Sequence, residues 1–507
     1  MKITLISLFP DLKAFGVRCL SACLKARGHF VQIIFLPKHF TSRYDQGTLT
    51  EVAKLSKESD LIGVSLTTNF FENAIQITRA LKKDGGVPIA WGGVHPTIRP
   101  EECLKYADIV CIGEGEETLV ELADSLSDGR NYYGIQGIWF NDKNQIIRNP
   151  NRRLIQDLNI LPFQDYDYEG HYVLSDGAVR KMDASVLDAD LLGAYTTMPT
   201  RGCPFGCTYC CNFTFNKMNP GQNPVRKRTA DNIIKELAER KNKFPFIKKI
   251  TFIDDAFLIY SDKEIEDFCR QYKENVGLPF SIDGGATPST LNRNKLSFLV
   301  DAGLVSLKMG IQTASERIKR LYNRHHTNQQ VEIAVNLINE FKDRIRMPHY
   351  DILLDNPWET EEELSQTLMF LSRFPGPFQL NTYSLTFYPG TGLYELAKTE
   401  GKLADELQSI YSKDYYFYSC KKTYLNKLFF LLNEYAFYGA RIPPKTMSWL
   451  TNSTARRLKI SRLIYAFLKI NSLLLKKKRL KIILAEGLKD IKKKDWVTIR
   501  RKFSRWI

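Results

Sequence analysis

Residues 200–212 read T-R-G-C-P-F-G-C-T-Y-C-C-N and hold Cys203, Cys207 and Cys210 in the spacing C-x-x-x-C-x-x-C. Three thiolates on one short loop cannot pair off as disulfides without leaving one over, but they can bind an iron–sulfur cluster. Cysteine thiolates are the usual ligands of such clusters, and a four-iron cluster needs four ligands. Three protein ligands leave one iron open, which is typical of a reacting metal site. A zinc knuckle and buried free cysteines are the alternatives.

Two neighbouring features sharpen this pattern. Tyr209 stands directly before the third cysteine, and T-T-M-P-T-R-G at 196–202 predicts a strand that leads into the loop. With them, the loop resembles that of the radical S-adenosylmethionine (SAM) enzymes. The resemblance implies that Cys203, Cys207 and Cys210 hold a four-iron four-sulfur cluster and that SAM chelates the open iron. Cleavage of SAM would then yield a 5′-deoxyadenosyl radical.

The N-terminal third alternates apolar runs with helical patterns. Strands are predicted at 2–8, 31–36, 61–66, 88–92 and 109–112, and helices at 15–27, 71–83 and 115–127. Such alternation predicts a parallel sheet covered on both faces, whose ligands bind at the carboxyl ends of the strands. Small residues follow three of these strands at 65–68, 92–96 and 113–116. Glycine there lets the backbone approach a large planar ligand, although glycine also simply ends strands.

The run W-G-G-V-H-P-T-I-R-P at 91–100, continued to residue 118, resembles the cobalamin-binding domain that precedes the barrel in one radical SAM subfamily. Cobalt-ligating domains carry D-x-H-x-x-G after the first strand, whereas this chain has Lys13 in place of the histidine. A protonated lysine is a poor cobalt ligand. The resemblance therefore implies cobalamin without a histidine from that loop, with His95 as a packing residue rather than a ligand. The implied contacts are Ser65, Thr67, Gly92, Gly93, Gly113 and Glu114; a domain that folds this way but binds nothing is the alternative.

A second strand–helix series predicts strands at 196–202, 248–254, 279–284, 306–311, 349–354 and 380–388. Six such units fit an incomplete parallel barrel, whose active site lies at the C-terminal mouth. Gly310-Ile311-Gln312-Thr313 and Arg324 resemble the SAM-binding element of the family, with Gln312 in place of the commoner glutamate. Asp254 and Asp255 end the second strand, and one of them is expected either to accept hydrogen bonds from the ribose hydroxyls of SAM or to cap the next helix, with Asp254 taken as the SAM contact. The segment from Asp355 resembles G-x-P-x-E-T with Asp355 in place of glycine.

The basic charge is confined to the C-terminal end. Residues 421–507 hold 23 Lys and Arg against 4 Asp and Glu, while the whole chain has a net charge of +16, so the other 420 residues carry about −3. Basic and apolar residues alternate at helical spacing within 457–484. Such a helix can pack on the barrel or bind a partner, lie on an anionic membrane surface, or bind nucleic acid. No recognised nucleic-acid module is visible, so nucleic acid is not the expected partner.

Together these observations predict an α/β protein in four parts. They are a doubly wound, flavodoxin-like cobalamin-binding domain (1–140), a connector (141–190), an incomplete parallel βα barrel of the radical SAM type (191–401) and a helical basic tail (402–507). Ten cysteines and no signal peptide predict a cytoplasmic protein, with possible peripheral attachment at the membrane.

The resemblance implies a cobalamin-dependent radical SAM enzyme with three cofactors: the four-iron four-sulfur cluster, SAM and cobalamin. Its implied SAM contacts are Tyr209, Asp254, Gln312 and Arg324. The expected reaction is methylation of an unactivated carbon in a small-molecule, lipid or peptide substrate. A reducing partner such as flavodoxin or ferredoxin would supply the electron. A non-methylating radical enzyme that forms rings or rearranges its substrate, and a non-catalytic cluster-binding redox module, are the alternatives.

Overall fold

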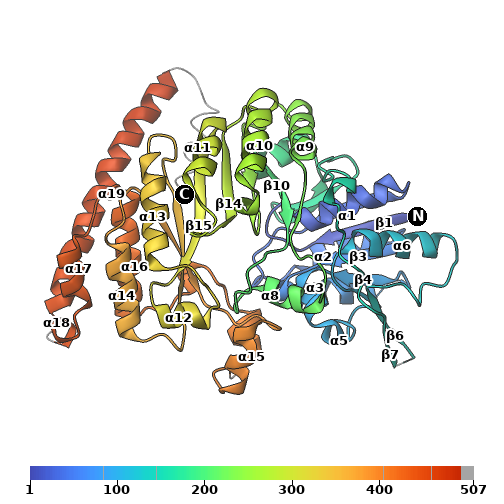
Figure 1. Cartoon of the computed structure of the whole chain (residues 1–507). Coiled ribbons are helices and arrows are strands. Elements are labelled where there is room, and N and C mark those ends of the chain that lie inside the picture. The colour runs from blue at the N-terminus through green and yellow to red at the C-terminus, as the bar shows by residue number, and fades with distance from the viewer. Residues whose placement is uncertain (84, 144, 404, 458–459, 493–507) are drawn as a thin grey trace. The chain divides into compact units, whose positions relative to one another are not determined.

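The computed structural model describes residues 1–83, 85–143, 145–403, 405–457 and 460–492 (Figure 1). The chain forms two compact units. Unit 1 comprises Met1–Ala256, Glu274–Val276 and Thr386–Asp414, and unit 2 comprises Phe257–Lys273, Gly277–Leu385 and Tyr415–Ile507. No helix in the described ranges is long and apolar enough to span a bilayer. Residues 493–507, part of the predicted basic tail, lie outside the described residues.

Unit 1 is built on a nine-stranded sheet with the order β7-β6-β5-β4-β3-β1-β2-β8-β9. Strands β1 to β5 run parallel in the order 2-1-3-4-5, which is the flavodoxin-like arrangement. Antiparallel strands β6, β7 and β9 extend its two edges. The strands are β1 (Lys2–Ser7), β2 (Phe30–Phe35), β3 (Leu61–Ser65), β4 (Ile89–Gly92), β5 (Ile109–Cys111), β6 (Ile138–Asp142), β7 (Gln145–Arg148), β8 (Tyr172–Ser175) and β9 (Ala178–Lys181).

The five parallel strands confirm the sequence prediction to within a residue or two, because each is a continuous apolar run buried on both faces. Their helices are α1 (Phe15–Ala26), α2 (Gln46–Ser56), α3 (Phe71–Leu81), α4 (Val94–Ile98), α5 (Pro100–Cys103) and α6 (Gly115–Ser127). Helix α2 was not predicted. Its buried side chains include only Leu49 and Val52 as large apolar residues, too few for a recognisable helical period.

The remainder of unit 1 surrounds the cysteine loop. Strand β10 (Ala194–Thr197) pairs in parallel with β13 (Lys249–Phe252), and β11 (Thr200–Arg201) pairs antiparallel with β12 (Arg226–Lys227). The helices of this part are α7 (Ala184–Leu191), α8 (Cys211–Met218), α9 (Ala230–Lys243) and α15 (Gly392–Thr399). Helix α8 begins within the cysteine loop, so the loop joins β11 to α8.

Unit 2 contains four parallel strands, β14 (Phe280–Ala286), β15 (Leu304–Gln312), β16 (His349–Leu354) and β17 (Gln379–Ser384). Burial alternates along β16 and β17, so that one face of the sheet is buried beneath helices and the other is half-exposed. The half-exposed face carries Asp351, Asn381 and Tyr383. The further elements are α10 (Asp262–Asn275), α11 (Arg293–Ala302), α12 (Glu316–Leu321), α13 (Asn328–Glu340), α14 (Glu361–Leu371), α16 (Tyr424–Phe437), α17 (Pro444–Thr451), α18 (Ser453–Arg457) and α19 (Ile460–Lys492).

Candidate active site

The three predicted cluster ligands lie on the loop between β11 and α8. Cys207 is buried, and Cys203 and Cys210 are half-buried. Cys211, the first residue of α8, donates a hydrogen bond that lowers the pKa of Cys210. Among the described residues, no three His, Cys, Asp or Glu side chains are arranged as ligands of a single metal ion. Cluster thiolates bind separate irons and need not converge on one point, so soft sulfur donors on one short loop fit an iron–sulfur cluster.

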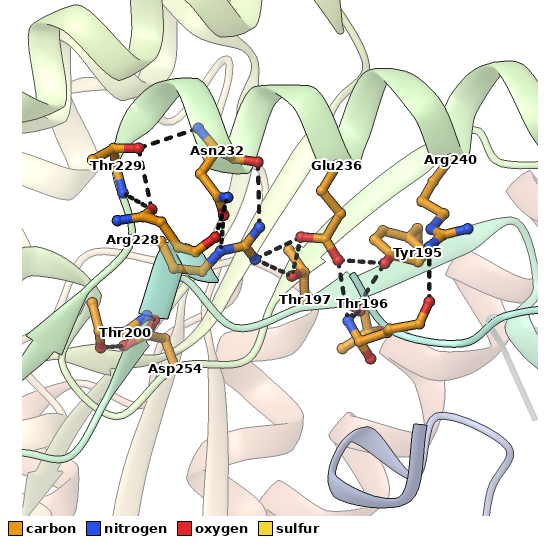
Figure 2. A network of polar contacts seen from close by, with 12 residues as sticks. Tyr195, Thr196, Thr197, Thr200, Arg228, Thr229, Asn232, Glu236, Arg240 and Asp254 are labelled. Atoms are coloured by element: carbon orange, nitrogen blue, oxygen red, sulfur yellow. Dashed lines mark hydrogen bonds and ion pairs between the residues drawn. The ribbon is translucent and has the colours of Figure 1, made fainter. Parts of the chain in front are cut away.

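A buried polar network fixes the strand that leads into this loop (Figure 2). Glu236 on α9 accepts hydrogen bonds from Tyr195 Oη at 2.6 Å and Thr197 Oγ1 at 2.9 Å, both on β10. Arg228 Nη1 lies 2.6 Å from the same carboxylate and neutralises it. Because Glu236 is fully buried, these partners are what makes its charge tolerable. Strand β10 is thereby clamped to α9.

Asp254 is used within the chain. Its carboxylate accepts hydrogen bonds from Thr200 N at 2.7 Å, Thr200 Oγ1 at 2.5 Å and Ala256 N at 2.7 Å. These bonds hold the start of β11 against the end of β13 (Figure 2). The neighbouring Asp255 instead lines the cavity described below. Burial raises the pKa of Asp255 in spite of a hydrogen bond from Asn212.

Gly202 is required by the geometry immediately before Cys203. Its φ is +79°, and a Cβ atom there would lie 1.9 Å from the carbonyl oxygen of Pro224. No other residue can occupy this position without moving the backbone. The loop is also held from the far end of unit 1, where Leu393 N donates to Thr208 O and Thr214 Oγ1 donates to Gly390 O.

A cavity of about 280 Å³ separates this loop from the strand ends of the nine-stranded sheet. One wall is formed by Gly93, Gly113 and Glu114, which follow β4 and β5. The other wall is formed by Gly202 and α8. This is the position in which a large planar cofactor was predicted. All of its lining residues belong to unit 1.

Glu114 joins these two walls by ion pairs. Arg226 Nη1 lies 2.7 Å from both Glu114 carboxylate oxygens, and Arg201 Nη1 lies 3.2 Å from Oε1. Arg201 also pairs with Glu116 at 2.5 Å. Burial alone would raise the pKa of Glu114, but the two guanidinium groups outweigh it and hold the pKa below its usual value. Arg201 and Arg226 could not be predicted from the sequence, because their partner lies about 90 to 110 residues earlier in the chain.

A second cavity of about 250 Å³ lies at the switch point of the sheet, among β1, β3, β4, β5 and the helices α1 and α6. Its walls are mostly apolar and include the predicted residues Ser65, Gly92, Gly93, Gly113 and Glu114. Open α/β sheets bind ligands at such a point. A Cβ on Gly93, whose φ is +108°, would lie 2.6 Å from Leu66 O, so the close backbone approach depends on glycine. Predicted Thr67 precedes Thr68–Phe70 and lines neither cavity.

The position of His95 bears on whether it packs within the fold or could ligate cobalt. Neither cavity has a histidine in its wall. His95 is fully buried, accepts or donates a 3.2 Å hydrogen bond with Thr68 and packs against Phe71 and Tyr411. Burial lowers the pKa of His95 to about 3. His95 thus lies in a packing position, as predicted. The Nζ atom of Lys13 lies 3.8 Å from Oδ2 of Asp11.

In unit 2, the predicted SAM contacts Gln312 and Arg324 lie next to one another. Both side chains approach Gly310, and Arg324 Nη2 donates to Gly310 O at 2.7 Å. Gln312 has a φ of +73° at the end of β15. Its Oε1 is buried and has no hydrogen-bond partner among the residues that the structure describes. An unpaired buried acceptor of this kind fits a site that is completed by a ligand.

In the loop after β16, Asp355 occupies the position of the glycine in the motif G-x-P-x-E-T. Its φ is +63°, in the left-handed region that glycine prefers. Its carboxylate accepts hydrogen bonds from Ser384 Oγ at 2.6 Å, Asn426 Nδ2 at 2.8 Å and Lys421 N at 3.0 Å. These bonds compensate the backbone strain and tie the loop to the start of α16.

Two family models match the chain. Residues 197–371 match the radical SAM superfamily, and residues 1–123 match the B12 binding domain. The chain belongs to the radical SAM enzymes that carry a cobalamin-binding domain. The predicted family, fold class and cofactors are thereby confirmed: the radical SAM domain uses a four-iron four-sulfur cluster and SAM, and the B12 binding domain uses cobalamin.

Individual relatives agree with the family. An uncharacterized methyltransferase of Pyrococcus horikoshii is 29% identical over 69% of this chain and 72% of its own length. An anaerobic magnesium-protoporphyrin IX monomethyl ester cyclase of Cereibacter sphaeroides is 27% identical over 62% of this chain and 49% of its own length. The radical SAM methyltransferase TsrM of Kitasatospora setae shares the fold, with a TM-score of 0.63 at 17% identity over 78% of each chain.

In the sequence of this radical SAM enzyme, Tyr209 stands between Cys207 and Cys210, and its side chain is half-buried. The roles of individual residues in holding cofactors stay predictions. Arg201 and Arg226 are the site residues that the sequence did not single out. Asp255 adjoins Asp254 in the run Phe252-Ile253-Asp254-Asp255, but nothing in the sequence says which carboxylate turns toward the cavity.

Proposed function

We propose that this radical SAM enzyme methylates an unactivated carbon of a small-molecule substrate. The observation that carries the proposal is the cavity in unit 1, which has cobalamin-domain strand ends on one wall and the cysteine loop with α8 on the other. A cofactor bound between these walls would contact the cobalamin-domain strand ends on one side and the cysteine loop on the other. When bound, the cluster and SAM supply a radical that takes hydrogen from carbon, and cobalamin supplies a methyl carrier.

The chain's own residues would hold and orient these groups. Cys203, Cys207 and Cys210 would ligate three irons, and the aromatic ring of Tyr209 would lie against SAM. Gln312 and Arg324 would bind polar groups of SAM through an amide and a planar cation. Since Asp254 is saturated within the chain, Asp255 would take the hydrogen-bonding role toward the ligand. For cobalamin, the proposed contacts are Ser65, Gly92, Gly93, Gly113 and Glu114, all of which line the second cavity, whereas Thr67 lines neither cavity and is no longer among them.

Methylation is favoured over other radical outcomes because the first-named relative is called a methyltransferase. The second is a cyclase, so ring formation is the second candidate. TsrM has been solved with tryptophan bound as substrate, which supports a small molecule here as well. A flavodoxin or ferredoxin would supply the electron for SAM cleavage. The peripheral membrane contact that the basic tail predicts would be made by α19.

The experiment is an anaerobic incubation of the reconstituted enzyme with SAM that carries a deuterated methyl group, in an extract that contains the substrate. Methylation yields a new product bearing the deuterated methyl, with S-adenosylhomocysteine and 5′-deoxyadenosine in equal amounts. Ring formation or rearrangement yields 5′-deoxyadenosine without S-adenosylhomocysteine or label transfer. If SAM is not cleaved even though the cluster is intact and a strong reductant is present, the chain is a cluster-binding module and the proposal is wrong.

The same assay tests the SAM contacts. Arg324→Gln removes a planar cation from the proposed SAM site and is expected to lower the yield of 5′-deoxyadenosine at least tenfold, since a charge-assisted bond is worth about 1.5–3 kcal/mol. The matched control is Arg320→Gln, which changes a neighbouring arginine on α12 that has no predicted SAM contact. Equal SAM cleavage by both variants would remove Arg324 from the site.

A further inference from the structure

Helix α19 has two opposite faces, and only one of them is needed to anchor it in unit 2. It lies along α16 and α17 (Figure 1). The anchored face carries Ser461, Leu468 and Ser472, all of which are buried. Tyr435 Oη of α16 donates to Leu468 O at 2.9 Å, and Ser472 Oγ donates to Glu434 at 2.8 Å. The spacing of the anchored residues, seven and four, is that of one helical stripe.

The opposite face carries a second stripe that is apolar and exposed. Leu463, Phe467, Ile470 and Leu474 recur at intervals of four, three and four residues, so they lie on one side of the helix over three turns. They are 74%, 71%, 61% and 58% exposed. Leu473 beside them is also exposed. Single exposed apolar residues are ordinary, but a contiguous row of large ones marks an interaction surface.

Basic residues border this stripe. Arg462, Lys469 and Lys476 recur every seven residues along one flank of the helix, and Lys477 lies three residues beyond Leu474, on the side of the stripe itself. Arg462, Lys476 and Lys477 are exposed, and Lys469 pairs with Glu434. The sequence adds more positive charge beyond them, since 421–507 hold 23 basic and 4 acidic residues. A second copy of this chain would bring the same positive flank against itself. The occupant must therefore offer an apolar layer with negative charge beside it.

We propose that α19 binds the surface of an anionic membrane, with the stripe Leu463, Phe467, Ile470 and Leu474 inserted among the lipids. A helix with an apolar side and flanking lysines or arginines lies in the plane of the interface. The helix does not need to span the bilayer, in keeping with the absence of any spanning helix among the described residues. The membrane contact brings the enzyme to a lipid surface and is independent of the chemistry proposed above.

The test uses the full-length reconstituted enzyme and sedimentation with phosphatidylcholine vesicles, with and without phosphatidylglycerol, at low and high salt. The wild type is expected to bind the anionic vesicles at low salt, to bind less at high salt and to ignore the neutral ones. Lys476→Gln with Lys477→Gln is expected to weaken binding about 30-fold, from the loss of two near-surface charges. Leu463→Ser with Phe467→Ser is expected to weaken it more than tenfold.

Matched controls change exposed residues of the same kinds elsewhere in unit 2. Ile333→Ser on α13 and Lys263→Gln on α10 should bind vesicles as the wild type does. Because the stripe faces away from α16, its variants should keep the wild-type yield of 5′-deoxyadenosine. The proposal is overturned if the wild type ignores anionic vesicles at low salt, or if the stripe variant binds them as well as the wild type. It is also overturned if the stripe variant instead splits a wild-type dimer in solution, since a second copy would then be the occupant.

Discussion

Arg226 holds one guanidinium nitrogen 2.7 Å from each carboxylate oxygen of Glu114. Glu114 follows the fifth strand of the cobalamin-binding sheet, and Arg226 begins the strand that pairs with the entry to the cysteine loop. Arg201, two residues before Cys203, completes the cluster of charges. These ion pairs join the strand ends of the cobalamin-binding sheet to the entry of the cysteine loop, which are the two walls of one cavity. The distance between the two walls therefore depends on buried ion pairs.

Replacing Glu114 with glutamine is expected to destabilise the apo enzyme by about 3 kcal/mol at neutral pH, because the buried Arg226 loses its counter-charge and Arg201 keeps only Glu116. The pKa of Glu114 is held below its usual value in the folded state. Its stabilisation is therefore present above the unfolded-state pKa of about 4.3 and is lost as the pH falls. Denaturant titrations at neutral pH and near pH 4 should show the difference between wild type and variant shrinking on acidification.

The control for that experiment is Glu101→Gln. Glu101 pairs with Arg148 at 2.7 Å, but both side chains are about half exposed. An exposed pair contributes about 0–1 kcal/mol, so this variant should behave nearly as the wild type. A Glu114→Gln variant as stable as Glu101→Gln would contradict a structural role for the buried charges.

Only three of the four neighbouring cysteines are expected to bind the cluster. Anaerobic reconstitution of the wild type and of Cys211→Ala should load about four irons per chain, whereas Cys207→Ala should load far fewer and lose SAM cleavage. Cys211 is the first residue of α8, and the spacing C-x-x-x-C-x-x-C is complete without it. Iron analysis and the yield of 5′-deoxyadenosine measure the outcome. A fully loaded, SAM-cleaving Cys207→Ala variant would show that the ligand set is wrong.

Filling the second cavity should prevent cobalamin binding without unfolding the sheet. A Cβ at Gly92 would meet Cys111 Cβ at an ordinary 3.7 Å, so Gly92→Leu can fold while its side chain occupies the cavity. The variant is expected to lose hydroxocobalamin on gel filtration, which the wild type retains. Gly134→Leu, at an exposed turn with nothing within 4 Å of its Cβ, is the control and should retain cobalamin. Retention by Gly92→Leu would exclude this cavity as the site.

Cobalt is expected to have no histidine ligand from this chain. The electron paramagnetic resonance spectrum of bound cob(II)alamin should lack the extra splitting that a nitrogen ligand produces. His95→Phe should leave that spectrum unchanged, because His95 is buried among aromatic rings and lines neither cavity. Nitrogen splitting that disappears in His95→Phe would make His95 a ligand after all.

The ionised carboxylate of Asp351 is predicted to lower the free energy of unfolding at neutral pH. Burial raises its pKa to about 6, despite a 2.8 Å hydrogen bond from Asn381. A carboxyl whose pKa is higher in the folded than in the unfolded state weakens the fold as the pH rises above about 3.9. Asp351→Asn should therefore stabilise the enzyme by about 2 kcal/mol at neutral pH and by little near pH 3.

The matched change for Asp351 is Asp267→Asn on α10. Its carboxylate is exposed and pairs with Arg270 within the same helix, so the variant should stay within about 0.5 kcal/mol of the wild type at either pH. Denaturant unfolding of the apo proteins measures both. Destabilisation by Asp351→Asn at neutral pH would mean that the ionised carboxylate supports the fold.

The sequence by itself determined the elements and the family. Runs rich in apolar residues, such as 3–6 and 33–36, predict the parallel strands, because a strand buried on both faces needs apolar side chains on both sides. The cysteine spacing with Tyr209 predicts the cluster loop, since all of its information lies within 13 consecutive residues. Lys13 likewise predicts that this loop offers cobalt no histidine ligand.

Only the tertiary structure decided which side chains meet. Asp254 and Asp255 are neighbours in sequence, yet one is bonded to Thr200 and Ala256 and the other faces the cavity, because the strand end turns between them. Arg226 reaches Glu114 across 112 residues, and the two faces of α19 are distinguished by what packs against it. Such pairings depend on the path of the chain through space, which local spacing does not encode.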